Sequence, residues 1–123
     1  MSVTATFDTS AWLEYFMGSS RGSRVKEVID STEAINTPSI CLLEIKSKYV
    51  REGREPAQRI DFVCSRSRII DLTKDVALSA ADFMAKHKLH TVDAVIYAAA
   101  RKHSSKLLTG DKHFSGLEGV ELI

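Results

Sequence analysis

Four carboxylates stand in sequence surroundings that are unusual for an acid. Asp8 and Asp111 follow short apolar segments whose residue types favour β-strands. Glu44 and Asp93 interrupt longer apolar stretches whose length favours helices. Because open parallel sheets bind ligands at the carboxyl ends of their strands, Asp8 and Asp111 are expected at a functional edge.

Carboxylates that converge in a fold need a compensating charge. Two of them ~4 Å apart repel by about 4 kcal/mol at an effective dielectric constant of about 20. A cluster therefore takes up protons or binds a cation. Oxygen donors without clustered histidines or cysteines suit Mg²⁺ or Mn²⁺ better than Zn²⁺. Ions held in this way activate water and stabilise attack on phosphate, so the four acids indicate phosphodiester hydrolysis.

Each acid also has an ordinary interpretation. Asp8 is an acceptable turn residue or helix cap, and Asp111 is an acceptable turn residue. Asp93 in the first turn of a helix would favour the helix dipole. Glu44 can pair with Lys48 four residues later. These alternatives do not explain why all four acids stand at strand ends or within apolar helices.

Short apolar segments alternate with longer amphipathic ones along the whole chain. Strands are predicted at 3–7, 34–36, 68–72, 106–109 and 119–122. Helices are predicted at 9–17, 24–30, 38–52, 56–64, 74–84 and 92–102. This alternation predicts an α/β fold, a three-layer α/β/α sandwich around a parallel sheet of about five short strands. Residues 1–123 are expected to form a single domain.

Hydroxyl residues mark the expected helix starts. The predicted N-caps are Thr9 or Ser10 for the first helix, Thr73 for the fifth and Thr91 for the sixth. Thr37 is predicted to cap the third helix, with Pro38 as its first helical residue.

The composition is that of an ordinary soluble domain. The chain has 17 basic and 16 acidic side chains, so RNA binding would need a local basic surface. The chain has no secretory signal and no run of about 20 apolar residues, so a cytoplasmic protein without a membrane segment is expected. Cys41 and Cys64 lack metal or redox spacing and are expected to be reduced and mostly buried.

Four pieces of the sequence, taken in order, resemble the PIN-domain family and most closely its VapC-type toxin branch. They are Phe7-Asp8-Thr9-Ser10-Ala11-Trp12, Glu44 on the helix begun by Pro38, the segment 91–100, and Leu108-Thr109-Gly110-Asp111-Lys112-His113-Phe114. Each piece alone is a common motif. Their order and spacing fit the family over essentially the whole chain.

This resemblance implies an endoribonuclease that depends on Mg²⁺ or Mn²⁺ and carries its acids at the carboxyl edge of a parallel sheet. It also implies the toxin of a type II toxin–antitoxin pair, a homodimer that a small antitoxin neutralises. The family's acidic positions fall on Asp8, Glu44, Asp93 and Asp111. Asp8, Asp93 and Asp111 are then the expected metal ligands. Glu44 would bind through water or orient the attacking water.

Further residues follow from the same resemblance. Ser10 and Thr109 fall near hydroxyl positions that support the carboxylates. Independently of the resemblance, Lys48 in a local run of basic residues and Lys112 beside Asp111 are candidates for phosphate contacts. His113 stands where many relatives carry another Asp, which puts a second metal position in doubt. This histidine is a candidate phosphate contact or occasional ligand.

Two other functions fit parts of the pattern, and a third does not. A receiver-like domain would bind Mg²⁺ and accept phosphate on Asp71, which follows the third predicted strand. A PIN-like binding module without activity would have the same fold, although retention of all four acids argues against it. A phosphatase of the haloacid-dehalogenase type would need an acid where Ser10 stands.

Overall fold

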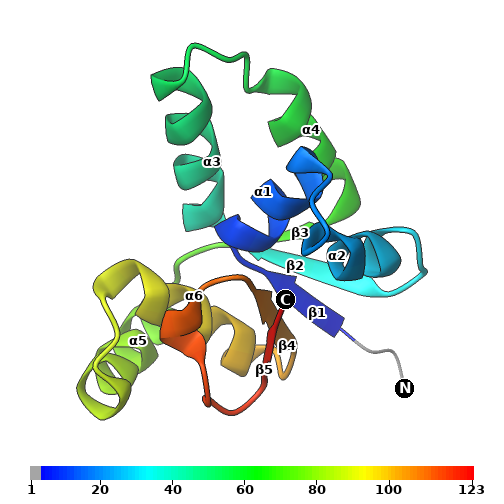
Figure 1. Cartoon of the computed structure of the whole chain (residues 1–123). Coiled ribbons are helices and arrows are strands. Elements are labelled where there is room, and N and C mark those ends of the chain that lie inside the picture. Colours follow the sequence, from blue (N-terminus) through cyan, green and yellow to red (C-terminus); the bar gives the residue numbers. More distant parts are fainter. Residues whose placement is uncertain (1–3) are drawn as a thin grey trace.

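Five short parallel strands form the centre of the molecule. The structure is a computed structural model that describes residues 4–123, so Val3 of the first predicted strand lies outside the described residues. The strands are β1 (Thr4–Phe7), β2 (Ala34–Pro38), β3 (Arg68–Ile70), β4 (Lys106–Thr109) and β5 (Val120–Leu122). Their order across the sheet is β3-β2-β1-β4-β5, and all neighbours are parallel (Figure 1).

Helices cover both faces of this sheet. One layer consists of α1 (Thr9–Met17), α2 (Gly22–Ile29), α3 (Ser39–Arg51) and α4 (Ala57–Arg66). The other consists of α5 (Lys74–His87) and α6 (Thr91–Lys102), and a short 3₁₀ helix, η1 (Lys112–Phe114), follows β4 (Figure 1). The predicted three-layer α/β/α fold is therefore confirmed. No helix within residues 4–123 is long and apolar enough to cross a membrane.

Each face of the sheet has its own hydrophobic core. Successive side chains of a strand point to opposite faces, so neighbouring leucines of β4 enter different cores. Leu107 packs with Tyr97 in the core beneath α5 and α6. Leu108 packs with Trp12 in the core beneath α1 to α4. A strand buried on both faces reads as a continuous apolar run, which explains the sequence pattern of β4.

The predicted start of the third helix is wrong. Thr37 and Pro38 belong to β2, and α3 begins at Ser39. The hydroxyl of Thr37 does not cap the helix, because it accepts a hydrogen bond from Trp12 Nε1 at 3.1 Å. It also lies 2.8 Å from Ser67 Oγ. A buried contact between distant elements therefore outweighs the local capping preference.

Two other predicted caps are also wrong, and one is confirmed. The N-cap of α1 is Asp8, not Thr9 or Ser10, and its carboxylate accepts from the amide of Ala11. Thr91 is the first helical residue of α6, which has no side-chain cap. Thr73 does cap α5, as expected, by accepting from Val76 N.

Helix α2 begins at Gly22, two residues before the predicted start, where it crosses α1 closely. A Cβ atom at this position would lie 2.5 Å from the main-chain oxygen of Glu14. Any side chain would therefore push the two helices apart. The Gly18-to-Ser23 segment, interpreted as a loop from its composition, thus also contributes the first turn of a packed helix.

One of the two cysteines differs from the expected pair of buried thiols. Cys41 on α3 is buried, whereas Cys64 on α4 is exposed. Val63 faces the core, and the next residue of a helix lies about 100° further round its axis, so Cys64 faces solvent. The prediction for Cys64 is therefore wrong.

Candidate active site

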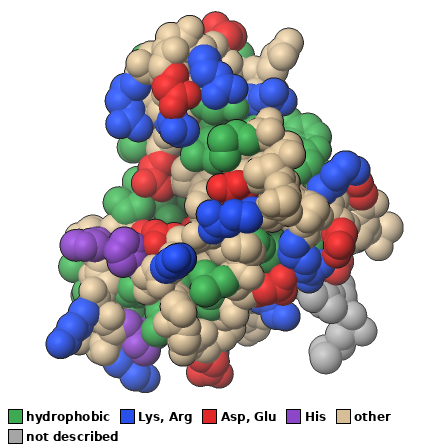
Figure 2. Space-filling view, in the orientation of Figure 1, with side chains coloured by type: hydrophobic (Ala, Val, Ile, Leu, Met, Phe, Trp, Pro, Cys, Tyr) green, Lys and Arg blue, Asp and Glu red, His purple; other side chains and the backbone are tan. Residues whose placement is uncertain are grey.

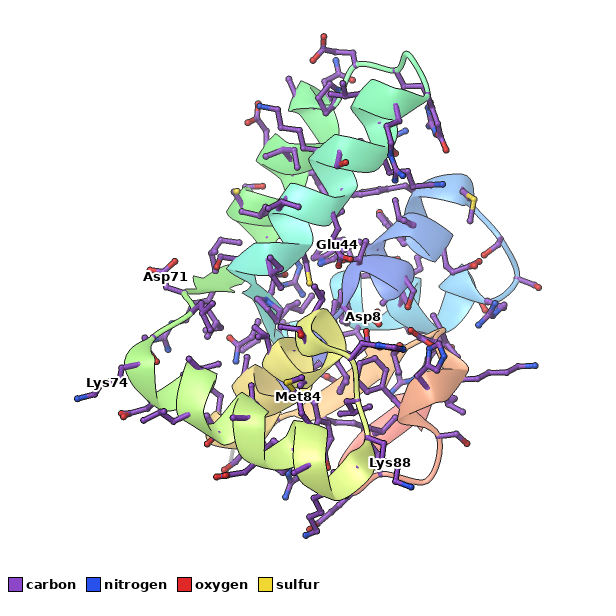
Figure 3. All side chains as sticks on the ribbon, turned by 90° about the vertical axis from the view of Figure 1, so that its left-hand side faces the viewer. Asp8, Glu44, Asp71, Lys74, Met84 and Lys88 are labelled. Carbon is purple, nitrogen blue, oxygen red and sulfur yellow. The ribbon has the colours of Figure 1, made fainter. Side chains whose placement is uncertain are left out.

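Strand order brings the acids of two strand ends together. Because β1 and β4 are neighbours and parallel, their carboxyl ends meet at the same edge of the sheet. Asp8 directly follows β1, and Asp111 is the N-cap of η1 just after β4. Glu44 lies on α3 and Asp93 in the first turn of α6. Figure 3 shows Asp8 and Glu44 near each other in the middle of the molecule.

Asp8 is a buried carboxylate held by three protein donors. Its side chain Oδ1 accepts from Ala11 N at 2.9 Å and Ser10 Oγ at 2.7 Å. Its Oδ2 accepts from Thr109 Oγ1 at 2.5 Å. Burial raises the pKa of Asp8 to about 6, although these hydrogen bonds lower it, and the negative charge of Asp111 adds a smaller rise. The fold therefore keeps this carboxylate in surroundings that disfavour its charge.

Two hydroxyl side chains connect the ends of β1 and β4. Thr109 Oγ1 donates to Asp8 and accepts from the amide of Asp111 at 2.9 Å. Ser10 Oγ also donates to Asp8, and it accepts from the amide of Gly110 at 2.8 Å. Both hydroxyls thus fix Asp8 relative to the loop that carries Asp111.

Asp93, Asp111 and His113 form a compact group beside Asp8. Each offers one donor atom, and the three atoms lie within 4.8 Å of one another. Asp111 Oδ1 accepts from the amide of His113 at 2.9 Å, and His113 Nδ1 lies 2.8 Å from the same oxygen. Partial burial raises the pKa of Asp93, and the charge of Asp111 raises it further. Glu44 adds a smaller rise, so these acids share one electrostatic environment.

Glu44 is positioned from α1 and not by its own helix. Thr9 Oγ1 donates to Glu44 Oε1 at 2.6 Å. The alternative pair between Glu44 and Lys48 is wrong, because Lys48 Nζ lies 2.8 Å from Glu52 Oε2. Thr9, interpreted from the sequence as a possible cap, instead holds this acid.

None of the four acids forms an ion pair with a lysine or arginine of residues 4–123. Other acids of the described chain do. Glu121, for example, forms ion pairs with both Arg24 and Lys106. On the hollowed left-hand side of Figure 2, acidic and histidine side chains gather between α3 and α6. Asp93 accepts no hydrogen bond within residues 4–123, which leaves its oxygens available to a cation. This set of carboxylates fits a hard divalent ion that prefers oxygen donors.

Arg21 supports the site, although the sequence did not single it out. Its Nη2 donates to the carbonyl oxygen of Gly110 at 2.6 Å, and its Nε donates to that of Ile123 at 3.2 Å. A Cβ at Gly110 would lie 2.7 Å from Arg21 Nη2, so glycine allows this close approach. The only sequence signal was an arginine within a Gly/Ser-rich loop, which is too common to predict such a contact.

Asp71, the acceptor that a receiver-like domain would need, lies apart from Asp8 and Glu44 (Figure 3). It lines a separate cavity of about 300 Å³ with Thr73, Lys102 and His103. The strand order also differs from the 2-1-3-4-5 order of receiver-like sheets, because β3 here lies at the edge. The receiver-like alternative is therefore not supported.

A family model described as the PIN domain matches residues 5–120. The chain belongs to the PIN-domain family. The match includes the strand ends and helices that carry all four acids. A comparison by sequence with curated proteins gives no match.

Solved structures similar to this PIN domain come from several bacteria. One is a toxin–antitoxin complex from Klebsiella pneumoniae, 26% identical, with a TM-score of 0.81 over 95% of each chain. Another is a VapBC complex from Rickettsia felis bound to a DNA fragment of its promoter, 17% identical, with a TM-score of 0.75 over 98% of each chain. A Mycobacterium tuberculosis VapC toxin that cleaves the sarcin–ricin loop is 21% identical, with a TM-score of 0.72 over 96% of this chain and 98% of that one. The two less similar structures show the shared fold alone.

Proposed function

We propose that this PIN domain is a metal-dependent endoribonuclease and the toxin of a toxin–antitoxin pair. The observation that carries the proposal is a buried carboxylate, Asp8, beside three further acids. None of these four acids forms an ion pair with a lysine or arginine of residues 4–123. A purely structural carboxylate at this depth would be expected to have a basic partner. A divalent cation supplies the missing positive charge.

The proposed roles follow from the positions of the side chains. Asp8, Asp93 and Asp111 are the proposed metal ligands, and Ser10 and Thr109 hold Asp8 in place. A bound Mg²⁺ or Mn²⁺ supplies Lewis acidity and a more acidic water. Glu44 has Oε1 held by Thr9, and its Oε2 accepts no hydrogen bond within residues 4–123. We assign this free oxygen to the orientation and deprotonation of the attacking water.

RNA cleavage by the purified protein tests the proposal directly. We expect a structured RNA to be cut in the presence of Mg²⁺ or Mn²⁺ and to remain intact in EDTA. Asp93→Asn should lose the activity. Asp82→Asn should keep it, because Asp82 is an exposed acid on a different helix, α5. Cleavage that persists in EDTA, or in Asp93→Asn at the wild-type rate, would contradict the proposal.

Thr109→Val should weaken activity through Asp8. Valine has nearly the same shape but removes the hydroxyl, so Asp8 Oδ2 loses its donor and the amide of Asp111 loses its acceptor. Loss of such a supporting contact typically costs roughly 10- to 100-fold in activity or metal affinity. Single-turnover cleavage rates and Mn²⁺ titration should both show the loss, and Thr109→Ser should restore both. Equal behaviour of the valine and serine variants would remove Thr109 from the site.

Lys112 is a better candidate for a phosphate contact than Lys48. Lys112 is exposed beside Asp111 and forms no ion pair within residues 4–123, whereas Lys48 is paired with Glu52. Lys112→Ala should therefore raise KM. It should also reduce by about 1 the slope of the logarithm of the RNA-binding constant against the logarithm of the salt concentration. Lys48→Ala should change both quantities less. KM measured over a series of KCl concentrations distinguishes the two variants, and a larger effect of Lys48→Ala would reverse the assignment.

The proposed function includes protein partners and a place of action. A small antitoxin is proposed because the Klebsiella pneumoniae structure, similar over nearly the whole chain, is a toxin–antitoxin complex. A homodimer is proposed because Leu43 and Val50, both on α3, are about 60% exposed. The protein would act in the cytoplasm, where its RNA substrate is found.

A further inference from the structure

Four exposed basic side chains form a row that leads away from the acids. His113 follows Lys112 on η1, and its ring centroid lies 6.1 Å from that of His90, the N-cap of α6. Lys88, the C-cap of α5, precedes His90 by two residues. The basic row, Lys112, His113, His90 and Lys88, therefore begins beside Asp111 and ends between α5 and α6. Figure 3 shows Lys88 at that end of α5.

The two lysines of the basic row form no ion pair within residues 4–123. Lysines on other surfaces of the described chain are paired with carboxylates, namely Lys26, Lys48, Lys102 and Lys106. On the left-hand side of Figure 2, histidine side chains border the hollow, and lysine or arginine side chains lie below them. Because the whole chain has a net charge of only +1, this row is the kind of local basic surface that RNA binding needs.

Lys88 has a backbone conformation that favours glycine. Its φ of 56° and ψ of 37° lie in the left-handed region, where a Cβ atom is crowded. Glycine is the usual residue in this conformation at the end of a helix. A basic residue here favours the helix dipole, but Lys86 and His87 already supply that charge in the last turn of α5. The strain at Lys88 therefore indicates a function for its side chain.

An RNA strand needs nearby cations to approach the four acids, because its phosphates are repelled by carboxylates. Screening limits electrostatic interactions at the surface to about 8 Å at physiological ionic strength, so each phosphate needs a cation close to it. Lys88 lies five residues before Asp93, so the two Cα atoms are at most about 18 Å apart. A short stretch of single strand covers such a distance, with its backbone following the positive groups.

We propose that the basic row binds the phosphates of the RNA strand on one side of the cleavage point, with Lys88 as its outermost contact. The inference rests on the proposed ribonuclease function and adds the path of the substrate to it. Lysine binds phosphate as a point charge, and the ring N–H groups of His90 and His113 donate to phosphate oxygens. Contacts of this kind position the strand without reading its sequence.

RNA binding measured without cleavage tests the role of Lys88. A fluorescein-labelled single-stranded RNA is titrated with the whole protein in EDTA, and fluorescence anisotropy gives the binding constant at a series of KCl concentrations. Lys88→Gly should weaken binding by roughly threefold or more at low salt. It should also reduce by roughly 0.7 to 0.9 the slope of the logarithm of the binding constant against the logarithm of the salt concentration. Lys88→Arg keeps the charge and should bind as the wild type does.

Urea unfolding separates this effect from a loss of structure. Lys88→Gly should be at least as stable as the wild type, because glycine adopts the left-handed conformation without strain. A variant that is more stable and yet binds RNA less tightly cannot owe its weaker binding to unfolding.

Lys74→Ala is the matched control. Lys74 is also an exposed lysine of α5 and forms no ion pair in the part of the chain that the structure describes. It begins the helix that Lys88 ends, about 21 Å away along the axis (Figure 3), so its loss should leave affinity and salt slope unchanged. Equal binding by Lys88→Gly and wild type, or equal losses in Lys88→Gly and either Lys74→Ala or Lys88→Arg, overturns the inference and leaves the proposed nuclease intact. A wild type that binds no RNA at the lowest salt concentration overturns both.

Discussion

Asp8→Asn is expected to abolish RNA cleavage and, at the same time, to stabilise the metal-free protein at neutral pH. Activity should fall by at least roughly 100-fold, more than for a residue that only supports a ligand. Asparagine can still cap α1, because it is as good an N-cap as aspartate. A role for Asp8 as a helix cap alone would therefore leave the variant fully active.

The stability effect follows from the raised pKa of Asp8. Burial raises this pKa from 3.8 to about 6, so the native state binds the proton more tightly than the unfolded chain. The stability contributed by protonated Asp8 is present below about pH 4 and is lost as the pH rises through about 6. Ionisation of the buried carboxylate then costs about 3 kcal/mol. Asparagine stays neutral and avoids this cost.

Urea unfolding in EDTA measures the effect. The variant should gain stability relative to the wild type between pH 4.5 and pH 7.5, by up to about 3 kcal/mol. Asp8→Ala is the matched control, because it also removes the charge but loses the cap, which costs about 1 kcal/mol. A difference between Asp8→Asn and wild type that does not change with pH would show that Asp8 does not titrate in this range.

Trp12→Ala is expected to have the largest effect on stability. The Trp12 side chain is fully buried and packs edge-on against Phe7 and Phe62, and its Nε1 donates to Thr37. Truncation of a buried tryptophan costs about 3–5 kcal/mol, a large part of the 5–15 kcal/mol that typically stabilises a domain. Activity should fall with the folded fraction, because α1 also positions Thr9 and Ser10 beside the acids.

Two variants give this measurement its scale. Trp12→Phe keeps an aromatic ring and should cost less, since Thr37 Oγ1 retains its contact with Ser67 Oγ after the indole N–H is lost. Leu78→Ala truncates a leucine that is 62% exposed and should stay within about 0.5 kcal/mol of the wild type. Urea unfolding of all three variants tests the order. A cost for Trp12→Ala as small as that for Leu78→Ala would contradict the packing described for α1.

Local sequence was sufficient to predict the elements and the two acids that follow strands. The adjacent leucines of β4, Leu107 and Leu108, enter two different cores, so this pair already indicates a strand that is buried on both faces. Asp8 and Asp111 could be placed at a shared edge because parallel strands end on the same side of a sheet. The PIN-domain resemblance rested on these same residues, and the family match confirms it.

Contacts between distant residues decided what local preference could not. Capping preference favoured Thr37 as a helix start, but Trp12, 25 residues earlier, uses its hydroxyl. Spacing favoured a pair between Glu44 and Lys48, but Thr9 from another helix holds Glu44. The predicted cap and the alternative ion pair were both wrong because a helix pattern contains no information about which side chains of other elements will meet it.

The sequence by itself thus determined the fold class and the two strand ends at which Asp8 and Asp111 stand. The tertiary structure decided that β1 lies beside β4, which places these two acids at one point of the sheet edge. It also decided that α6 brings Asp93 to the same point, where His113 joins it. Strand order and helix docking depend on the burial of both faces of the sheet at once, and that is a property of the whole chain.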